Sequence, residues 1–178
     1  MTALTAQVNQ RLDRWQQQLP WVATAIRLGL AGVFFTSGWP KFVDSAGTIR
    51  SVRAFQLVPE VFVPAFGYAL PVVELLLGVL LLVGLVTRVS AAITAGLMVM
   101  FLFGIVMAWA RGLEIDCGCF GSGDVVKDAV AGYIRDILRD VGFLVLAALL
   151  WLRPRSALSL DGVLGLTPTD DGAVRAGV

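Results

Sequence analysis

The two cysteines of this 178-residue chain stand one residue apart, in the polar run from Asp116 to Gly121. Two thiols at this spacing can form a disulfide, exchange electrons with another thiol protein or bind a metal. Long apolar segments precede and follow the run. We therefore expect the chemistry of Cys117 and Cys119 to take place at the surface of a membrane.

A disulfide between Cys117 and Cys119 would be a weak structural staple. It closes so short a loop that the chain-entropy model gives only about 1 to 2 kcal/mol. In an extended chain the two Cα atoms would stand about 7 Å apart, beyond the usual bridge distance, so Gly118 has to let the backbone fold. A strained, exposed disulfide exchanges readily. These magnitudes favour a redox pair, and a structural staple stays as an alternative.

Metal binding is the third interpretation of the two thiols. A structural zinc site takes four nitrogen or sulfur ligands, and this chain has two cysteines and no histidine. A soft ion such as Cu(I) accepts two thiolates, with Asp116 beside them and Met107 a turn or two away. Binding of Cu(I) by Cys117 and Cys119 therefore stays open.

A thiolate needs a positive field to be stable, and no histidine or lysine adjoins the cysteines. Arg111, Lys127, Arg135 or a bound partner must supply that field.

Composition places the chain among integral membrane proteins. Hydrophobic residues make up 57% and charged residues 15%, the mean hydropathy is +0.81, and soluble domains carry about 25% charged residues. A formal net charge of +1 without basic runs excludes a nucleic-acid footprint. The absence of histidine removes the usual general base and the usual haem or copper ligand. We therefore do not expect oxidase chemistry within this chain alone.

Four apolar segments predict an all-α integral membrane four-helix bundle, because about 20 residues cross the hydrocarbon core of a bilayer. The first three segments lie at 20–39, 66–86 and 90–110. The fourth is clearly apolar only over 141–152, about 18 Å of helix, so we expect it to begin earlier, near Ala129. The predicted membrane domain spans residues 20–152.

The two ends of the chain are predicted to lie outside this domain. Apolar residues recur at helical spacing within residues 1–19, between arginines and glutamines, which predicts a surface amphipathic helix at the membrane interface. A solvated tail is the alternative for this stretch. Residues 153–178 begin with Arg-Pro-Arg and are rich in glycine, which predicts a flexible tail.

Ionisable residues inside the apolar segments need partners, because an isolated charge there costs from about 2.5 kcal/mol upward. We expect Arg27 of the first segment and Glu74 of the second to form an intramembrane ion pair. The pair would fix packing, or Glu74 would relay protons. Four more charged residues stand at the start of the fourth segment, just beneath the cysteines: Arg135, Asp136, Arg139 and Asp140. A cavity there would hold a quinone headgroup, or an arginine would stabilise a thiolate.

Topology follows from the number of crossings and from the basic residues. Four crossings put both termini on one side, and Arg88, Arg153 and Arg155 near the helix ends predict that this side is cytoplasmic. The cysteines then face the extracytoplasmic space, where disulfides persist. The outer loop at 41–64 is long enough to close over them as a lid, although its apolar residues suit packing on the membrane surface equally well.

Three stretches of the chain carry a family resemblance: residues 27–42, residues 71–78 with 84–88, and the Cys-Gly-Cys-Phe-Gly run at 117–121. They resemble the MauE family of membrane proteins, named for methylamine utilisation, within the wider DoxX-like group. The cysteine run is the specific part, since the glycine-rich helical stretches are shared with DoxX-like proteins that lack cysteines. The resemblance covers roughly residues 20–152.

The resemblance implies a four-helix membrane protein that assists disulfide or electron-transfer chemistry beside a thioredoxin-like partner, with methylamine dehydrogenase maturation as the namesake role. The predicted function is a thiol–disulfide redox protein in which Cys117 and Cys119 pass electrons between an extracytoplasmic thioredoxin-like partner and a membrane acceptor, with quinone as the candidate. A non-catalytic accessory subunit of a respiratory or oxidoreductase complex and a Cu(I)-handling protein are the alternatives. The residues predicted to support the two cysteines are Asp116, Gly118, Phe120, Arg135, Arg139 and Asp140.

Overall fold

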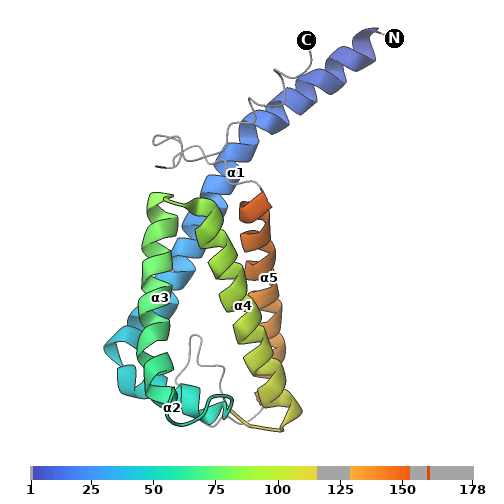
Figure 1. The fold of residues 1–178 in the computed structure, drawn as a ribbon. Coiled ribbons are helices and arrows are strands. Elements are labelled where there is room, and N and C mark those ends of the chain that lie inside the picture. Colours follow the sequence, from blue (N-terminus) through green and yellow to red (C-terminus); the bar gives the residue numbers. More distant parts are fainter. Residues whose placement is uncertain (1, 116–128, 153–159, 161–178) are drawn as a thin grey trace, which may run out of the picture.

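The computed structural model describes residues 2–115, 129–152 and 160, and its elements over this range are all α-helices. In chain order they are α1 (Thr2–Val43), α2 (Ser45–Ala54), α3 (Val63–Val83), α4 (Thr87–Ala110) and α5 (Ala129–Leu152), as Figure 1 shows. The predicted all-α class is therefore confirmed for the part of the chain that is described.

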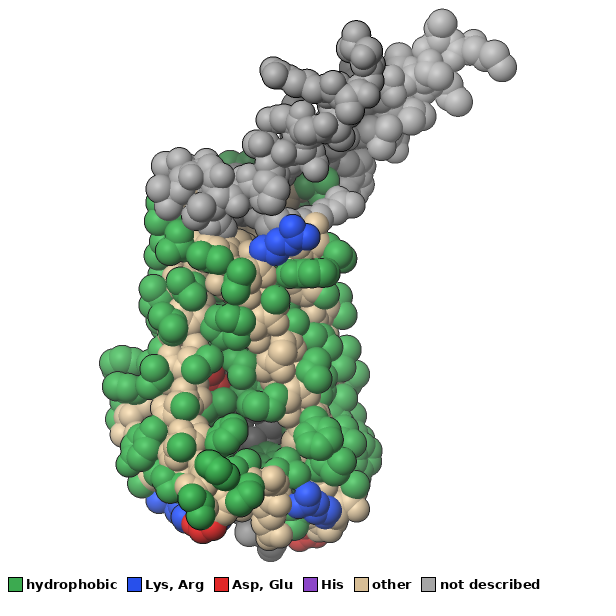
Figure 2. Space-filling model, in the orientation of Figure 1, with side chains coloured by type: hydrophobic (Ala, Val, Ile, Leu, Met, Phe, Trp, Pro, Cys, Tyr) green, Lys and Arg blue, Asp and Glu red, His purple; other side chains and the backbone are tan. Residues whose placement is uncertain are grey.

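Three of the helices are long and apolar enough to cross a membrane. Their spanning parts are Gln18–Val43, Val63–Val83 and Thr87–Ala110. Apolar side chains cover the face of the molecule in Figure 2, and the charged side chains on this face gather mainly near its two ends. A surface of this kind suits the hydrocarbon core of a bilayer. The chain is thus built as a multi-pass membrane protein.

The fourth expected span corresponds to α5, which is described over Ala129–Leu152. Its 24 residues give about 36 Å of helix, enough to cross a bilayer. The charged residues of its first turns keep α5 out of the set of clearly apolar spans. A four-helix transmembrane bundle therefore stays a prediction, with three of its helices supported.

Helix α1 differs from its prediction, because it is one continuous helix of 42 residues, about 63 Å long. The sequence predicted a break after residue 19 and an end near Trp39, yet α1 passes through both Pro20 and Pro40. A proline inside a helix removes one backbone hydrogen bond but does not have to end the helix. At Pro20 the carbonyl oxygen accepts a hydrogen bond from the Thr24 hydroxyl at 2.8 Å. The N-terminal part of α1 projects beyond the other helices (Figure 1).

The helices pack as two pairs, α1 against α3 and α4 against α5. A core cluster from α1, α3, α4 and α5 joins the pairs, with Leu30, Leu81 and Ala147 among its fully buried members. A short turn connects α3 to α4, where Gly84 adopts a left-handed conformation with φ of 71°. From this turn α3 and α4 diverge toward the opposite end of the molecule (Figure 1).

Helix α2 occupies the wide end between α3 and α4, so the predicted outer loop at 41–64 contains a helix of its own (Figure 1). Asp44 caps α2, because its Oδ1 accepts a hydrogen bond from the N–H of Gly47 at 2.8 Å. Gly67 of α3 allows the close contact with α2, since a Cβ at this position would lie 3.1 Å from the backbone of Ile49. The wide end is thereby closed by a packed helix.

Candidate functional site

The predicted redox pair and its neighbours lie outside the described residues: Asp116, Cys117, Gly118, Cys119 and Phe120. The structure does describe the chain on both sides of them. Ile115 before the run and Ala129 after it are both buried in one hydrophobic cluster with Tyr133. The segment that carries the cysteines is therefore attached at both ends to the part of the bundle where α4 and α5 meet.

Tyr133 of α5 fixes the chain just before the cysteines. Its hydroxyl donates a hydrogen bond to the carbonyl oxygen of Leu113 at 2.7 Å and accepts one from the N–H of Ile115 at 3.3 Å. The side chain is only 2% exposed. The buried Tyr133 hydroxyl thus gives a hydrogen-bond partner to the carbonyl of Leu113 and to the N–H of Ile115, two backbone groups that lie outside the helices. Sequence reasoning missed this residue, because nothing in the pattern of α5 shows which loop it faces.

Arg111, a candidate source of positive field for a thiolate, caps the C-terminal end of α4. Its Nη1 donates hydrogen bonds to the carbonyl oxygens of Phe55 and Gln56, at 3.3 and 3.1 Å. These bonds tie the end of α2 to the end of α4. The described contacts of Arg111 therefore support the α2 segment, and its action on the cysteines stays a prediction.

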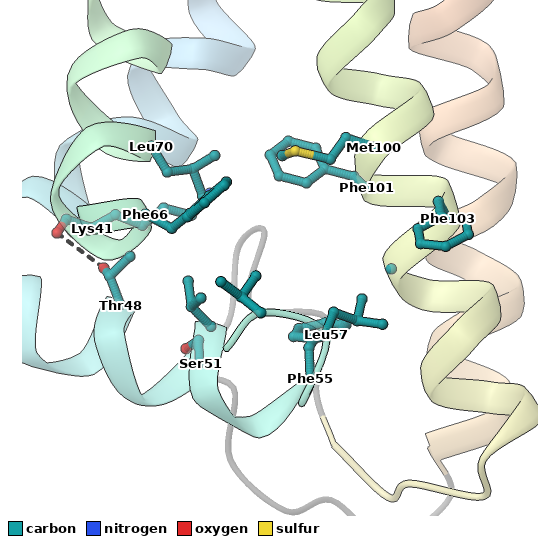
Figure 3. A pocket seen from close by; sticks show the side chains of 13 residues that line it. Lys41, Thr48, Ser51, Phe55, Leu57, Phe66, Leu70, Met100, Phe101 and Phe103 are labelled. Carbon is teal, nitrogen blue, oxygen red and sulfur yellow. Dashed lines mark hydrogen bonds between the residues drawn. The ribbon is translucent and has the colours of Figure 1, made fainter. Parts of the chain in front are cut away.

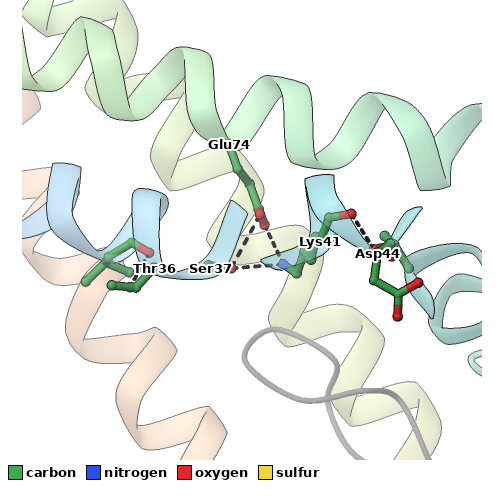
Figure 4. A network of polar contacts seen from close by, with 7 residues as sticks. Thr36, Ser37, Lys41, Asp44 and Glu74 are labelled. Carbon is green, nitrogen blue, oxygen red and sulfur yellow. Dashed lines mark hydrogen bonds and ion pairs between the residues drawn. The ribbon is translucent and has the colours of Figure 1, made fainter. Parts of the chain in front are cut away.

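A buried ion pair joins α1 to α3 (Figure 4). Lys41 Nζ lies 2.8 Å from Glu74 Oε1 and donates a second hydrogen bond to Ser37 Oγ at 2.9 Å. Ser37 Oγ in turn donates to Glu74 Oε2 at 3.4 Å. Gly38 lets the two helices approach here, because a Cβ at this position would lie 3.1 Å from the Cβ of Glu74. The close contact between α1 and α3 therefore occurs at the same level as the Lys41–Glu74 ion pair.

Lys41 is the described ion partner of Glu74, whereas the sequence predicted Arg27 in this role. Arg27 lies ten residues before Ser37, about 15 Å along the axis of α1, whereas Glu74 stands level with Ser37 and Lys41. Arg27 is itself buried at 2% exposure. The prediction missed Lys41 because α1 was expected to end near Trp39. Once the helix continues through Pro40, Lys41 falls one turn after Ser37 and on the same face.

The charged residues at the start of α5 divide into a buried set and an exposed one. Arg139 forms ion pairs with Asp136 and Asp140, both at 2.9 Å, and the two carboxylates are buried. Arg135 lies on the exposed face of the helix. Two of the predicted supporting residues, Arg139 and Asp140, therefore contact each other, and Asp136 joins them. The predicted residue Arg135 lies outside this buried set.

A small cavity separates this set from the Lys41 pair. Ser37, Glu74 and Asp140 line it together with apolar side chains, and its volume of about 10 Å³ is the size of one water molecule. Asp140 Oδ2 is buried and has no hydrogen-bond partner among the described residues. The polar groups of α1, α3 and α5 therefore meet around a space that suits one bridging water.

A larger, apolar cavity of about 280 Å³ has Lys41 in its wall (Figure 3). Its walls come from α2, from the turn after α2 and from the facing parts of α3 and α4. The sequence predicted a ligand cavity beside the charges of α5. Among the described residues, a water-sized cavity lies beside these charges, and the ligand-sized cavity lies between α2, α3 and α4.

Among the described residues no group of three histidine, cysteine, aspartate or glutamate side chains gathers into a metal site. Cys117 and Cys119 are not among the residues considered. The prediction of Cu(I) binding by the two thiols therefore stays a prediction.

Comparison with known proteins gives the family. The family described as "Methylamine utilisation protein MauE" matches residues 19–153. The chain is 35% identical over 138 residues to a methylamine utilization protein MauE of Methylorubrum extorquens, covering 76% of this chain and 72% of the relative. It is 32% identical over 131 residues to the protein of the same name in Paracoccus denitrificans, covering 73% and 67%. No solved structure matches the chain. Because the match includes the three apolar helices and α5, this chain belongs to the MauE family of membrane proteins.

Proposed function

We propose that this protein is a thiol–disulfide redox protein of the membrane, working in methylamine utilisation. Cys117 and Cys119 cycle between dithiol and disulfide, and they pass electrons between an extracytoplasmic thioredoxin-like partner and a membrane acceptor. The pathway is suggested by the names of the two relatives. The chemistry is suggested by the spacing of the thiols, which gives an exchangeable disulfide rather than a strong staple.

The proposed cycle balances without a further co-reactant. Exchange with the partner breaks the Cys117–Cys119 disulfide and forms a disulfide in the partner. Reoxidation then forms the S–S bond again and releases two electrons and two protons. A quinone takes up both and becomes a quinol. The net reaction converts a partner dithiol and a quinone into a partner disulfide and a quinol.

The observation that carries this proposal is the attachment of the chain at Ile115. Tyr133 and the surrounding apolar cluster hold Ile115 in place, and Cys117 follows two residues later. The described anchor at Ile115 therefore stands only two residues before Cys117 in the sequence. A packed support this close in sequence to the thiols suits repeated exchange with a docking partner, and this supports the proposal.

The proposal includes an orientation. With four spans and cytoplasmic termini, the end that carries α2 would face the extracytoplasmic side, as would the connection between α4 and α5 that carries the cysteines. Disulfides persist in that compartment, and a thioredoxin-like partner would meet the cysteines there.

Alkylation with mass measurement, on full-length protein equilibrated in a series of redox buffers, tests the chemistry. We expect Cys117 and Cys119 to gain and lose labels together in one reversible two-electron titration. The variant with Cys117→Ser and Cys119→Ser should fold normally and show no titration. A pair that resists reduction and oxidation under all non-denaturing conditions contradicts the proposal.

Growth tests the pathway. In a methylamine-using bacterium that lacks its own MauE, the wild-type chain should restore growth on methylamine and the double serine variant should not. Restoration by the serine variant would instead favour a docking role in which the thiols take no part.

A further inference from the structure

The apolar cavity beside Lys41 has the size and the lining of a small-molecule site. Its volume of about 280 Å³ lies just below the usual range for ligand pockets, about 300 to 1,000 Å³, which suits a small ring. Four phenylalanine side chains line it: Phe55, Phe66, Phe101 and Phe103. Such a wall favours a flat ring, because aromatic rings gain energy by stacked or edge-to-face contact beyond what burial gives.

The cavity is reached from the membrane. Phe66 of α3 and Met100 and Phe103 of α4 form part of its wall, and they are 46%, 40% and 54% exposed. Figure 2 shows the outer face hollowed between the green side chains of the two diverging helices. Both helices are apolar enough to span a bilayer. A ligand that enters between them must therefore be soluble in lipid.

Lys41 gives the cavity a hydrogen-bond donor. Its ammonium group carries three N–H donors, of which Glu74 Oε1 and Ser37 Oγ take two. The third has no acceptor among the described residues. Lys41 Nζ stands 5.4 Å from the ring centroid of Phe101, and both residues line the cavity. A ligand in this space is therefore offered one strong donor at the edge of an aromatic wall.

Thr48 adds the complementary group. Its hydroxyl donates toward the carbonyl oxygens of Lys41 and Asp44, at 3.1 Å in each case. The Thr48 oxygen can thus accept a hydrogen bond from a ligand but has no proton to give. The cavity offers a donor for an oxidised carbonyl oxygen and an acceptor for a reduced hydroxyl.

We propose that this cavity binds the ring of a lipid-soluble quinone, entering between α3 and α4, with one quinone oxygen accepting the third N–H of Lys41. The proposal rests on the proposed function, for which it supplies the site of the membrane acceptor. An acyl chain would fill the same apolar space but would leave the Lys41 donor without an acceptor, which is costly in a buried place.

The position of the cavity fits electron transfer from the cysteines. Phe55 lines the cavity and also packs against the apolar cluster that contains Ile115 and Ala129. The support of the cysteine run and the wall of the cavity are therefore one packed unit. In the transfer step the two thiols lose two electrons and two protons and form the S–S bond, and the quinone gains both and becomes the quinol.

Two glycines of α4 give a matched pair of test variants. A Cβ on Gly104 would meet the ring of Phe55 at an ordinary 3.7 Å, so a larger side chain there would extend into the cavity. A Cβ on Gly96 of the same helix would meet nothing within 4 Å. Gly104→Leu should therefore fill the site, and Gly96→Leu should leave it open. Gly104→Ala should keep the fold and remove less of the cavity volume than Gly104→Leu.

The test is direct binding of radiolabelled decylubiquinone to full-length protein in nanodiscs, measured against empty nanodiscs. Wild type and Gly96→Leu should bind alike, Gly104→Leu should bind at least tenfold more weakly, and Gly104→Ala should lie between. The double variant Lys41→Gln/Glu74→Gln should bind decylubiquinone about tenfold more weakly. The amide of a glutamine at position 41 has two N–H donors, and the groups at positions 37 and 74 accept both, so none is left for the quinone. Thermal unfolding shows which variants remain folded.

Equal binding by folded Gly104→Leu or Gly104→Ala and by wild type would overturn the site, as would binding no stronger than to empty nanodiscs. Release of phospholipid instead of quinone from the wild type, detected by mass spectrometry, would overturn the choice of ligand. The variant with both cysteines replaced by serine separates this proposal from the proposed function. It should bind decylubiquinone as wild type does, even if the thiols prove to have no redox titration.

Discussion

Lys41 Nζ lies 2.8 Å from Glu74 Oε1 inside the helical bundle, and the two side chains are only 9% and 1% exposed. Each charge is stabilised there mainly by the other and by Ser37. Removing one member of a buried pair leaves the other uncompensated, which costs about 3 to 5 kcal/mol. Loss of either member alone is therefore expected to destabilise the contact between α1 and α3.

We expect Glu74→Ala and Lys41→Met each to lower the free energy of unfolding by about 3 to 5 kcal/mol. Lys41→Gln/Glu74→Gln should cost clearly less, because two amides remain hydrogen-bonded without a buried net charge. Thermal unfolding of the purified proteins in one detergent gives the ranking. A double variant as unstable as the sum of the two single variants would show that the pair adds nothing.

The sequence predicted the burial of Glu74 but not its partner, and the reason lies in one helix boundary. Hydropathy ends the first span near Trp39 because Pro40 and Lys41 resemble a loop. The helix continues through Pro40, and that single turn carries Lys41 into the bundle. The extension of the fourth segment back from residue 141 was predictable, because about 12 apolar residues are too short to cross a bilayer and α5 is described from Ala129 onward.

The apolar cavity could not be predicted from the sequence. Its walls come from α2, α3 and α4, and it exists because α3 and α4 diverge and α2 closes the wide end. Periodicity reports which face of one helix is apolar, but it does not report the angle between two helices. Tyr133 was missed for a similar reason, since its hydrogen bonds reach a segment about 20 residues away.

Arg139 and Arg135, one turn apart on α5, should respond differently to the same substitution. Arg139 pairs with the buried carboxylates of Asp136 and Asp140, whereas Arg135 is exposed. Arg139→Leu should cost about 3 to 5 kcal/mol, because two buried carboxylates lose their cation. Arg135→Leu should change stability by less than about 0.5 kcal/mol. Equal unfolding temperatures for the two variants would contradict the buried cluster.

The turn between α2 and α3 should depend on pH through Glu60. Arg53 Nε donates to Glu60 Oε1 at 2.8 Å, and this hydrogen bond holds the pKa of Glu60 below its ordinary value of 4.5. A carboxyl with a lowered pKa in the folded state stabilises the fold above its unfolded pKa and loses this effect as the pH falls through the folded pKa. The turn should therefore loosen only below about pH 4.5.

Hydrogen exchange of residues 53–60 as a function of pH measures this loosening. Leu57 and Val58, which line the apolar cavity, lie in this turn, so their amides are the informative ones. In Glu60→Gln the acid-induced increase in exchange, after correction for the intrinsic rate, should disappear. An increase of the same size in the variant would assign the pH response to another group.

Tyr133 offers the sharpest link between the described structure and the cysteines. Tyr133→Phe removes one hydroxyl and leaves the carbonyl of Leu113 and the N–H of Ile115 without their partner, at a cost of about 1 to 3 kcal/mol. Because Cys117 follows Ile115 by two residues, loss of this anchor should let the thiols sample more positions. We expect faster alkylation of reduced Cys117 and Cys119 and faster hydrogen exchange at residues 113–115. Tyr68→Phe is the matched control, since Tyr68 is 57% exposed on α3. If both variants alkylate at the wild-type rate while 113–115 exchange faster, the anchor supports the fold but does not position the thiols.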